Sequence, residues 1–232
     1  MSDIAQALRE VRRRIDAAAN AAGRDPSSAR LIAVSKTQPA QAVREAYAAG
    51  QRDFGENYVQ ELLQKAEQLR DLPELRWHLI GHLQRNKAKQ IVSLVQLLHT
   101  VDSLELASEL AKRVAALGSE RRLPVLVEVS IAGEEQKHGA DPSALPRLLD
   151  AIDALPALSL QGLMCVPPLS ENPADARPHF DRLQELRERH GGARRLPELS
   201  MGMTHDLEHA VAAGATLVRV GTAIFGARAL KV

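Results

Sequence analysis

The hydrophobic and polar positions of this chain follow two periods, one typical of buried strands and the other of amphipathic helices. Polar-apolar stretches of helical period occupy residues 39–50, 56–69, 103–118, 142–155 and 176–192. Short apolar or β-branched runs recur among them, at residues 31–35, 52–57, 76–83, 97–103, 124–131, 160–166, 198–203 and 217–226. Strands that read as near-continuous apolar runs and alternate with helices form parallel sheets covered on both faces. The pattern therefore predicts an α/β protein with a parallel sheet.

The number of these units and the length of the chain favour a closed barrel. Eight strand candidates in 232 residues match a (β/α)8 TIM barrel, which typically has about 250 residues. We expect one domain over residues 1–232, with an extra N-terminal helix over residues 2–22 that closes the bottom of the barrel. An open doubly wound sheet is the alternative. However, the first apolar run leads into VSKTQPA, which lacks the G-x-G-x-x-G turn of dinucleotide-binding folds.

Composition and charge exclude several classes of function. The 30 basic and 29 acidic side chains leave a net charge of +1, too small to direct the whole surface toward nucleic acid or an anionic membrane. The chain has 3 Phe, 2 Tyr and 1 Trp, few for a platform that stacks single-stranded nucleic acid. The single cysteine, Cys165, excludes an intrachain disulfide and fits a reducing compartment. Since no run approaches the roughly 18 apolar residues of a membrane span, we expect a cytoplasmic protein that binds neither nucleic acid nor membranes.

The carboxyl ends of the predicted strands carry the candidate chemistry, because barrel enzymes place their reactive groups there. Lys36 follows the first apolar run directly, and partial burial at this point would favour its neutral, nucleophilic amine. Lys36 is therefore a candidate for Schiff-base formation. On position alone, a surface lysine that opens a loop is the simpler alternative.

Two glycine-containing turns supply a candidate phosphate site. The segment SMGMT, with Ser200 and Gly202, follows the seventh strand, and Gly221 and Thr222 follow the strand part of the eighth run. The loops after strands seven and eight are the usual phosphate site of such barrels, because glycine lets backbone N–H groups approach and a helix N-terminus favours an anion. A lysine and a phosphate site at one barrel mouth suggest pyridoxal phosphate, which has an aldehyde at one end and a phosphate at the other.

Arg219 supports this interpretation because it interrupts an apolar strand and shares a face with Leu217 and Gly221. A guanidinium that points into a barrel needs an acceptor. At the pyridine nitrogen of the cofactor it would disfavour protonation and weaken the ring as an electron sink. A salt bridge to a neighbouring strand is the alternative.

These residues lie within the motifs AVSKT, FGENYVQE, WHLIGHLQRNK, VEVSIAGEEQKHG, GLMCVPP, LSMGMTHDLEHA and VRVGTAIFGAR. In this order, over residues 4–228, the motifs resemble the YggS/PROSC-type pyridoxal phosphate homeostasis proteins, whose barrel is similar to that of bacterial alanine racemase. The resemblance implies a Schiff base on Lys36 with Asn57 nearby, Arg219 at the ring nitrogen, and Ser200, Gly221 and Thr222 at the phosphate. It also implies a role in buffering, protecting or delivering pyridoxal phosphate to apo-enzymes that depend on it, without an established catalytic reaction. We expect a monomer or a weak dimer.

Two enzyme functions are the alternatives. An amino-acid racemase on the same scaffold needs a base on each face of the substrate α-carbon. Tyr47 and Tyr58 are the tyrosines of this chain, and both lie in helical stretches, so we expect no racemisation at an enzyme-like rate. A class I aldolase-like enzyme would instead use Lys36 directly on a sugar phosphate.

Several histidines and a second lysine have chemistry that these assignments do not use. His205 and His209 form an H-x-x-E-H motif on a short helix that we expect to begin near Thr204, and since no further ligand is indicated we predict no zinc site there. His78 and His82 share a strand parity, and we expect them to line the barrel mouth rather than bind a metal. Lys137 either approaches the cofactor, as a second acceptor, or caps a loop.

Overall fold

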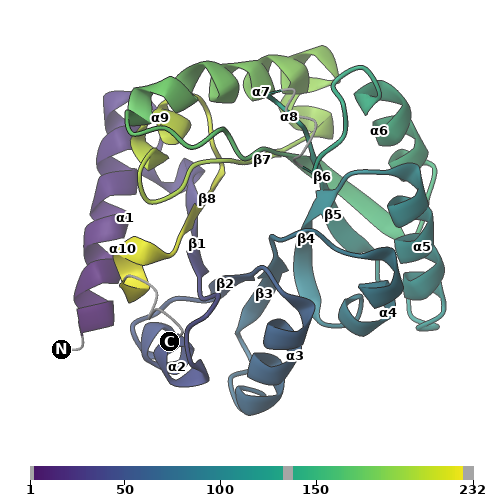
Figure 1. Ribbon diagram of the computed structural model, residues 1–232, viewed down its shortest axis with the longest axis horizontal. Helices are drawn as coiled ribbons and strands as arrows, with labels where there is room; N and C mark the ends of the chain where they lie inside the picture. The colour runs from purple at the N-terminus through teal and green to yellow at the C-terminus, as the bar shows by residue number, and fades with distance from the viewer. Residues whose placement is uncertain (1–2, 133–137, 227–232) are drawn as a thin grey trace.

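The computed structural model describes residues 3–132 and 138–226, and its central feature is a closed barrel of parallel strands (Figure 1). Each strand pairs with its neighbours in sequence order, and β8 (Leu217–Val220) pairs with β1 (Arg30–Val34) to close the ring. The others are β2 (Asp53–Glu56), β3 (Arg76–Leu79), β4 (Val95–Val101), β5 (Leu123–Glu128), β6 (Leu158–Met164) and β7 (Glu198–Ser200). Each strand overlaps one predicted run. The TIM-barrel prediction is therefore confirmed, and the open sheet is excluded.

Helices surround this barrel as an outer ring (Figure 1). The predicted helical stretches become α2 (Ala40–Ala48), α3 (Val59–Gln68), α5 (Leu104–Ala115), α6 (Leu145–Asp153) and α7 (Arg177–Arg189). Shorter elements complete the connections: α4 (Ala88–Ile91), α8 (Gly192–Arg195), α9 (Leu207–Ala212), α10 (Thr222–Phe225) and the 3-10 turns η1 (Pro26–Ser28), η2 (Arg85–Lys87) and η3 (Pro173–Ala176). Over the described ranges, no helix is both long enough and apolar enough to cross a membrane.

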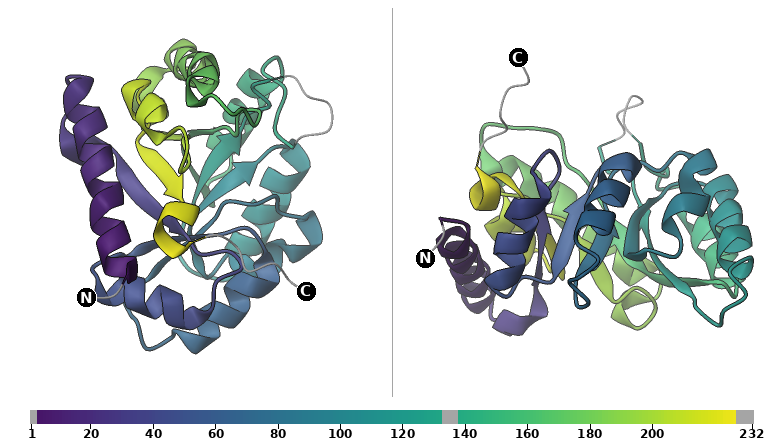
Figure 2. Two further views of the ribbon diagram at one scale, coloured as in Figure 1. Left: turned by 60° about the vertical axis from the view of Figure 1, so that its left-hand side comes forward. Right: turned by 90° about the horizontal axis from the view of Figure 1, so that it is seen from below.

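The predicted N-terminal helix is present as α1 (Asp3–Ala21), but its position differs from the prediction. It packs on the outside of the barrel against α9, α10 and α2 rather than across the bottom (Figures 1 and 2). Its buried residues form one apolar face at helical spacing: Leu8, Val11, Ile15 and Ala19. The predicted closure of the bottom is wrong because this apolar face is buried against helices of the outer ring, α9, α10 and α2.

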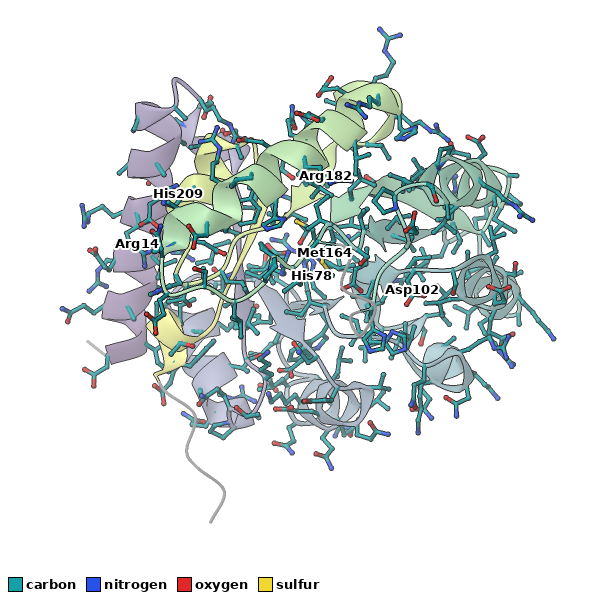
Figure 3. The ribbon with its side chains drawn as sticks, turned by 45° about the horizontal axis from the view of Figure 1, so that its top comes forward. Arg14, His78, Asp102, Met164, Arg182 and His209 are labelled. Carbon is teal, nitrogen blue, oxygen red and sulfur yellow. The ribbon has the colours of Figure 1, made fainter. Side chains whose placement is uncertain are left out.

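The inside of the barrel contains both apolar and polar side chains. A small apolar cluster consists of Ile32, Leu97, Leu126, Met164 and Leu217. His78, like Met164, lies in the middle of the ring (Figure 3). Further buried polar residues on the strands include His99, Ser200 and Arg219. Because buried polar groups need partners, these side chains lead directly to the candidate site.

Candidate functional site

The predicted site residues lie on four neighbouring strands, β7, β8, β1 and β2, or directly after them. Val34 at the end of β1 lies opposite Gly55 of β2, and a Cβ on Gly221 would be 3.0 Å from the carbonyl oxygen of Val34. The Arg219 N–H donates to the carbonyl of Gly202 at 2.9 Å. The barrel thus brings to one side, near its carboxyl-terminal end, Lys36, Asn57, Ser200, Gly202, Arg219, Gly221 and Thr222.

Lys36 is half-buried in the turn that follows β1. Thr37 beside it has a φ of 64°, a left-handed conformation that is costly for a β-branched residue. The Thr37 N–H donates to Oε1 of Glu61 at 2.5 Å, and the Gln38 N–H donates to the carbonyl of Ser35 at 3.0 Å. Lys36 is therefore presented by a strained turn that a carboxylate of α3 holds in place.

A buried ionic cluster supports this turn. The Lys65 ammonium donates to the Ser35 carbonyl at 2.5 Å and to Oε1 of both Glu56 and Glu61 at 2.7 Å. The Ser35 hydroxyl donates to the same Glu56 oxygen at 2.6 Å. Burial raises the pKa of Glu56, and the charge of Lys65 opposes that rise. The cluster ties the end of β2 and the buried face of α3 to the residue that precedes Lys36.

Sequence reasoning missed Lys65 and Glu56, although each had a signal. Lys65 lies three residues after Leu62, on the face of α3 that is buried, where a lysine needs an anionic partner. Glu56 is a carboxylate at the end of a strand that is buried along its whole length. Neither signal identifies the partner, because residues 56 and 65 meet only when α3 packs beside β2.

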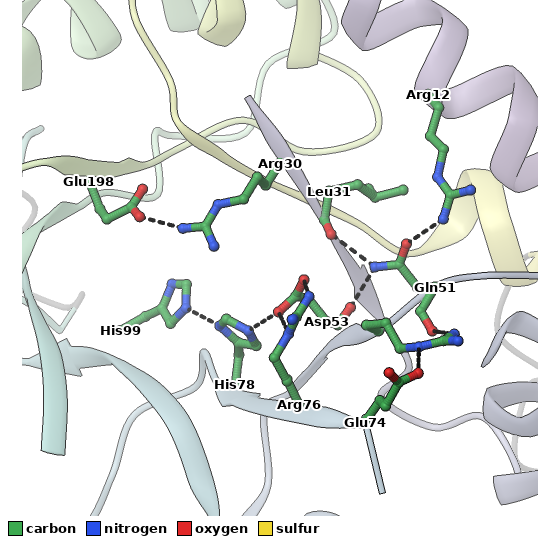
Figure 4. A network of polar contacts seen from close by, with 11 residues as sticks. Arg12, Arg30, Leu31, Gln51, Asp53, Glu74, Arg76, His78, His99 and Glu198 are labelled. Atoms are coloured by element: carbon green, nitrogen blue, oxygen red, sulfur yellow. Dashed lines mark hydrogen bonds and ion pairs between the residues drawn. The ribbon is translucent and has the colours of Figure 1, made fainter. Parts of the chain in front are cut away.

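A chain of hydrogen bonds runs through the inside of the barrel from Arg219 to Asp53. Arg219 Nη1 donates to Ser200 Oγ at 2.7 Å, and Ser200 Oγ lies 2.9 Å from Nδ1 of His99. His99 Nε2 lies 3.0 Å from Nδ1 of His78, whose Nε2 lies 3.0 Å from Oδ1 of Asp53 (Figure 4). The chain has a guanidinium, which only donates, at one end and a carboxylate, which only accepts, at the other.

These ends fix the direction of every hydrogen bond. The Nε2–H of His78 donates to Asp53, the Nε2–H of His99 donates to His78, and the Ser200 hydroxyl donates to His99. Burial lowers the pKa of both histidines, which favours these neutral tautomers. Burial alone would raise the pKa of Asp53, but hydrogen bonds from His78 and Arg76 hold it well below its usual range.

The hydrogen-bond chain gives the Ser200 side chain other partners than the phosphate that the sequence predicted for it. Its hydroxyl contacts Arg219 and His99 inside the barrel, and phosphate binding by this residue stays a prediction. Arg219 also donates through Nη2 to the Cys165 carbonyl at 3.0 Å. Burial lowers the pKa of Arg219, but a guanidinium remains protonated in proteins. The structure therefore supplies a fixed buried cation at this position.

The glycine turns of the predicted phosphate site are close-packed. Gly202 has a φ of +90°, and a Cβ on it would lie 2.4 Å from the Cβ of Ala210, so no larger residue fits. Thr222 is exposed at the first position of α10. The expected helix start near Thr204 is wrong by three residues, because Oδ1 of Asp206 accepts the Met203 N–H at 2.6 Å and closes a turn before α9 begins.

Among the described residues, three buried side-chain oxygens near this end of the barrel have no hydrogen-bond partner. They are Oε2 of Glu56 at the end of β2, Oδ1 of Asn57 directly after it, and Oε2 of Glu128, the last residue of β5. Burial, together with the nearby charge of Asp102, raises the pKa of Glu128 to about 7. Unpartnered buried polar atoms are costly, and a polar ligand at the barrel mouth would relieve that cost.

The histidines that the sequence analysis singled out lie in three separate environments. His78 lies buried within the barrel, so its predicted place at the mouth is wrong, whereas His82 lies at the mouth with Nδ1 3.3 Å from Oδ2 of Asp102. In the H-x-x-E-H motif, His205 is exposed and Glu208 binds Arg14 at 2.7 Å. Lys137 lies outside the described residues.

The comparisons with known proteins agree with this fold. The alanine racemase N-terminal domain family matches residues 7–229. The pyridoxal phosphate homeostasis protein of Pseudomonas aeruginosa is 50% identical over 230 residues, which cover 98% of this chain and 97% of that one. The protein of the same name in Escherichia coli K12 is 44% identical over 236 residues, covering 98% of each chain.

Solved structures show the same relationship. PipY of Synechococcus elongatus, with pyridoxal phosphate bound, superposes with a TM-score of 0.83 at 41% identity, covering 97% of this chain and 100% of that one. Alanine racemase of Corynebacterium glutamicum is 19% identical with a TM-score of 0.67, covering 95% of this chain and 61% of that one. This last similarity is one of fold alone.

Proposed function

This chain belongs to the pyridoxal phosphate homeostasis family, within the wider alanine racemase N-terminal domain family, and from that premise we propose that it binds pyridoxal phosphate and buffers, protects or delivers it. The observation that carries the proposal is the grouping of Lys36, Arg219 and the Gly221 turn on adjacent strands of the barrel. An amine for the aldehyde, a fixed buried cation for the ring nitrogen and a glycine turn for the phosphate are what this cofactor needs.

The residues present fit the cofactor. Lys36 is the amine that binds the aldehyde as a Schiff base, and Asn57 offers a buried oxygen that no described residue contacts by a hydrogen bond. Gly202, Gly221 and Thr222 form the phosphate end of the site. When bound, pyridoxal phosphate supplies an aldehyde that reacts reversibly with amines and a ring that delocalises electrons.

Arg219 faces the ring nitrogen in this proposal and disfavours its protonation. The guanidinium is held in one orientation by Ser200 and by the Cys165 carbonyl, and the hydrogen-bond chain to Asp53 lets Ser200 accept from it. These residues would thereby weaken the ring as an electron sink.

We favour a carrier over a racemase because the tyrosines of this chain lie away from the barrel interior. Tyr47, in α2, has the guanidinium of Arg52 stacked 4.0 Å from its ring centroid. Tyr58 is 61% exposed. Neither supplies the second base that racemisation requires. We place the carrier in the cytoplasm, with apo-enzymes that depend on pyridoxal phosphate as its partners.

An absorption spectrum of the purified protein tests the assignment of Lys36. The wild type should show a long-wavelength Schiff-base band that borohydride removes, and peptide mapping should find the reduced cofactor on Lys36. Lys36→Ala should abolish the band, whereas Lys89→Ala, at an exposed position of α4, should keep it. An unchanged band in Lys36→Ala, with the cofactor not mapped to Lys137, would refute the site.

A further inference from the structure

His82, Asp102 and His138 form a cluster at the barrel mouth that the proposed cofactor site does not use. Each offers a ligating nitrogen or oxygen atom, and these atoms all lie within 4.8 Å of one another. The imidazole rings of His82 and His138 stack with centroids 3.7 Å apart and an interplanar angle of 8°. Within the described ranges, this is the one group of three or more such side chains close enough to hold a metal ion.

The backbone fixes all three positions. His82 follows Gly81, whose carbonyl accepts the Thr100 hydroxyl at 2.9 Å and where a Cβ would lie 2.2 Å from the carbonyl oxygen of Asn57. Asp102 (Figure 3) comes directly after β4, and its Oδ1 accepts the Ser103 hydroxyl at 3.0 Å. That contact leaves Oδ2 directed at His82.

His138 is held from its carboxyl-terminal side. Ala140 forms a parallel bridge with Val129, and its N–H donates to the Glu128 carbonyl at 2.7 Å. Gly139, between His138 and Ala140 in the sequence, has a φ of +123°, and a Cβ on it would lie 2.7 Å from the Ser130 nitrogen. The return of the chain to the end of β5 therefore carries His138 to His82.

We propose that His82, Asp102 and His138 bind a divalent transition-metal ion at the mouth of the barrel. Two imidazoles and one carboxylate, with the remaining positions open to water, are typical of zinc and other borderline metals. The ligand bonds of zinc measure about 2.0–2.2 Å, so the three atoms need to approach one another. Two nearly parallel stacked rings do not both direct a lone pair at one ion, so metal binding requires the exposed His138 ring to rotate out of its stack. The half-exposed His82 and the Asp102 carboxylate already lie side by side.

Isothermal titration calorimetry of the protein with Zn²⁺ tests this site. Co²⁺ serves as a spectroscopic probe of the same site. We expect one ion per chain, and Co²⁺ absorption bands that report nitrogen and oxygen ligands. His82→Asn, Asp102→Asn and His138→Asn should each weaken binding by about tenfold or more, since even indirect ligand partners contribute about 10–100-fold to metal affinity. His205→Asn is the matched control and should bind as the wild type does.

Because the three substituted side chains are exposed or partly exposed, we expect the variants to fold. Thermal unfolding without metal verifies this for each variant. Added Zn²⁺ should raise the unfolding temperature of the wild type and of His205→Asn, but not that of the three ligand variants. Equal Zn²⁺ affinity in the wild type and the three variants would overturn the site, as would absence of saturable binding in the wild type. Loss of binding in His205→Asn alone would also overturn it.

Discussion

Replacing Lys65 with methionine removes the cation at the centre of the cluster that supports the Lys36 turn. The side chains of Lys65 and Glu56 are 6% and 0% exposed, so water cannot replace the lost contacts without a structural change. Lys65→Met has a similar shape but no charge. The substitution deletes the hydrogen bonds to Ser35, Glu56 and Glu61. Of its two partners in the cluster, the buried Glu56 carboxylate then keeps only the Ser35 hydroxyl.

Breaking a buried ion pair from one side typically costs about 3–5 kcal/mol. For a chain of this length, each kcal/mol lowers the unfolding temperature by about 2–4 °C, so we expect a decrease of roughly 6 to 20 °C. Burial already raises the pKa of Glu56, and loss of the Lys65 charge raises it further. Because the folded-state pKa then lies above the unfolded-state value, protonation stabilises the folded variant, and the loss should shrink as the pH falls.

Thermal unfolding at about pH 8 and about pH 5 measures this effect. Lys89→Met, on the exposed part of α4, is the matched control and should change little. The double variant Lys65→Met/Glu56→Gln removes the unpaired charge and should recover part of the stability at the higher pH, and it keeps the test informative if the single variant fails to fold. Pyridoxal phosphate affinity should fall in both Lys65 variants, because the Lys36 turn loses its support.

Equal unfolding temperatures for Lys65→Met and Lys89→Met at both pH values would refute the reasoning. A double variant less stable than Lys65→Met at the higher pH would also refute it, because the cost would then not come from the buried Glu56 charge.

The remaining predictions concern the cofactor site and its surroundings. Thr222→Ala should weaken binding of pyridoxal phosphate by about 1.5–3 kcal/mol but leave binding of pyridoxal unchanged, whereas Ser200→Ala should weaken binding of both ligands because Ser200 acts through Arg219. Equilibrium dialysis with the two ligands measures these affinities, and equal losses for both ligands in Thr222→Ala would contradict the assignment of Thr222 to the phosphate. Because burial raises the pKa of Glu128 to about 7, the cofactor-free fold loses stability as the pH rises from the unfolded-state pKa of this carboxyl, and the loss is complete above about 7. Glu128→Gln should therefore raise the unfolding temperature more at about pH 8 than at about pH 5, and an equal shift at both would disprove the assignment. Deuterium exchange at the α-carbon of L-alanine should stay at trace level, and turnover near about 10 s⁻¹ would instead establish a racemase.

The sequence by itself determined the barrel and the position of the cofactor-site residues along it. Apolar runs of strand length and helical stretches are local patterns, so all the strands and the main helices could be predicted. Lys36 and the Gly221 turn were identifiable because both come directly after strands, and a parallel barrel brings all such ends to one face.

Only the tertiary structure decided which side chains meet. The chain from Arg219 through Ser200, His99 and His78 to Asp53 joins residues of β8, β7, β4, β3 and β2, and hydropathy does not reveal such pairings. The position of α1 depended on which helices of the outer ring cover its apolar face. The meeting of His82 with His138 depended on where the chain returns to β5. In each case the contact depends on packing between segments that are distant in sequence. The local pattern of hydrophobic and polar residues contains no information about such packing.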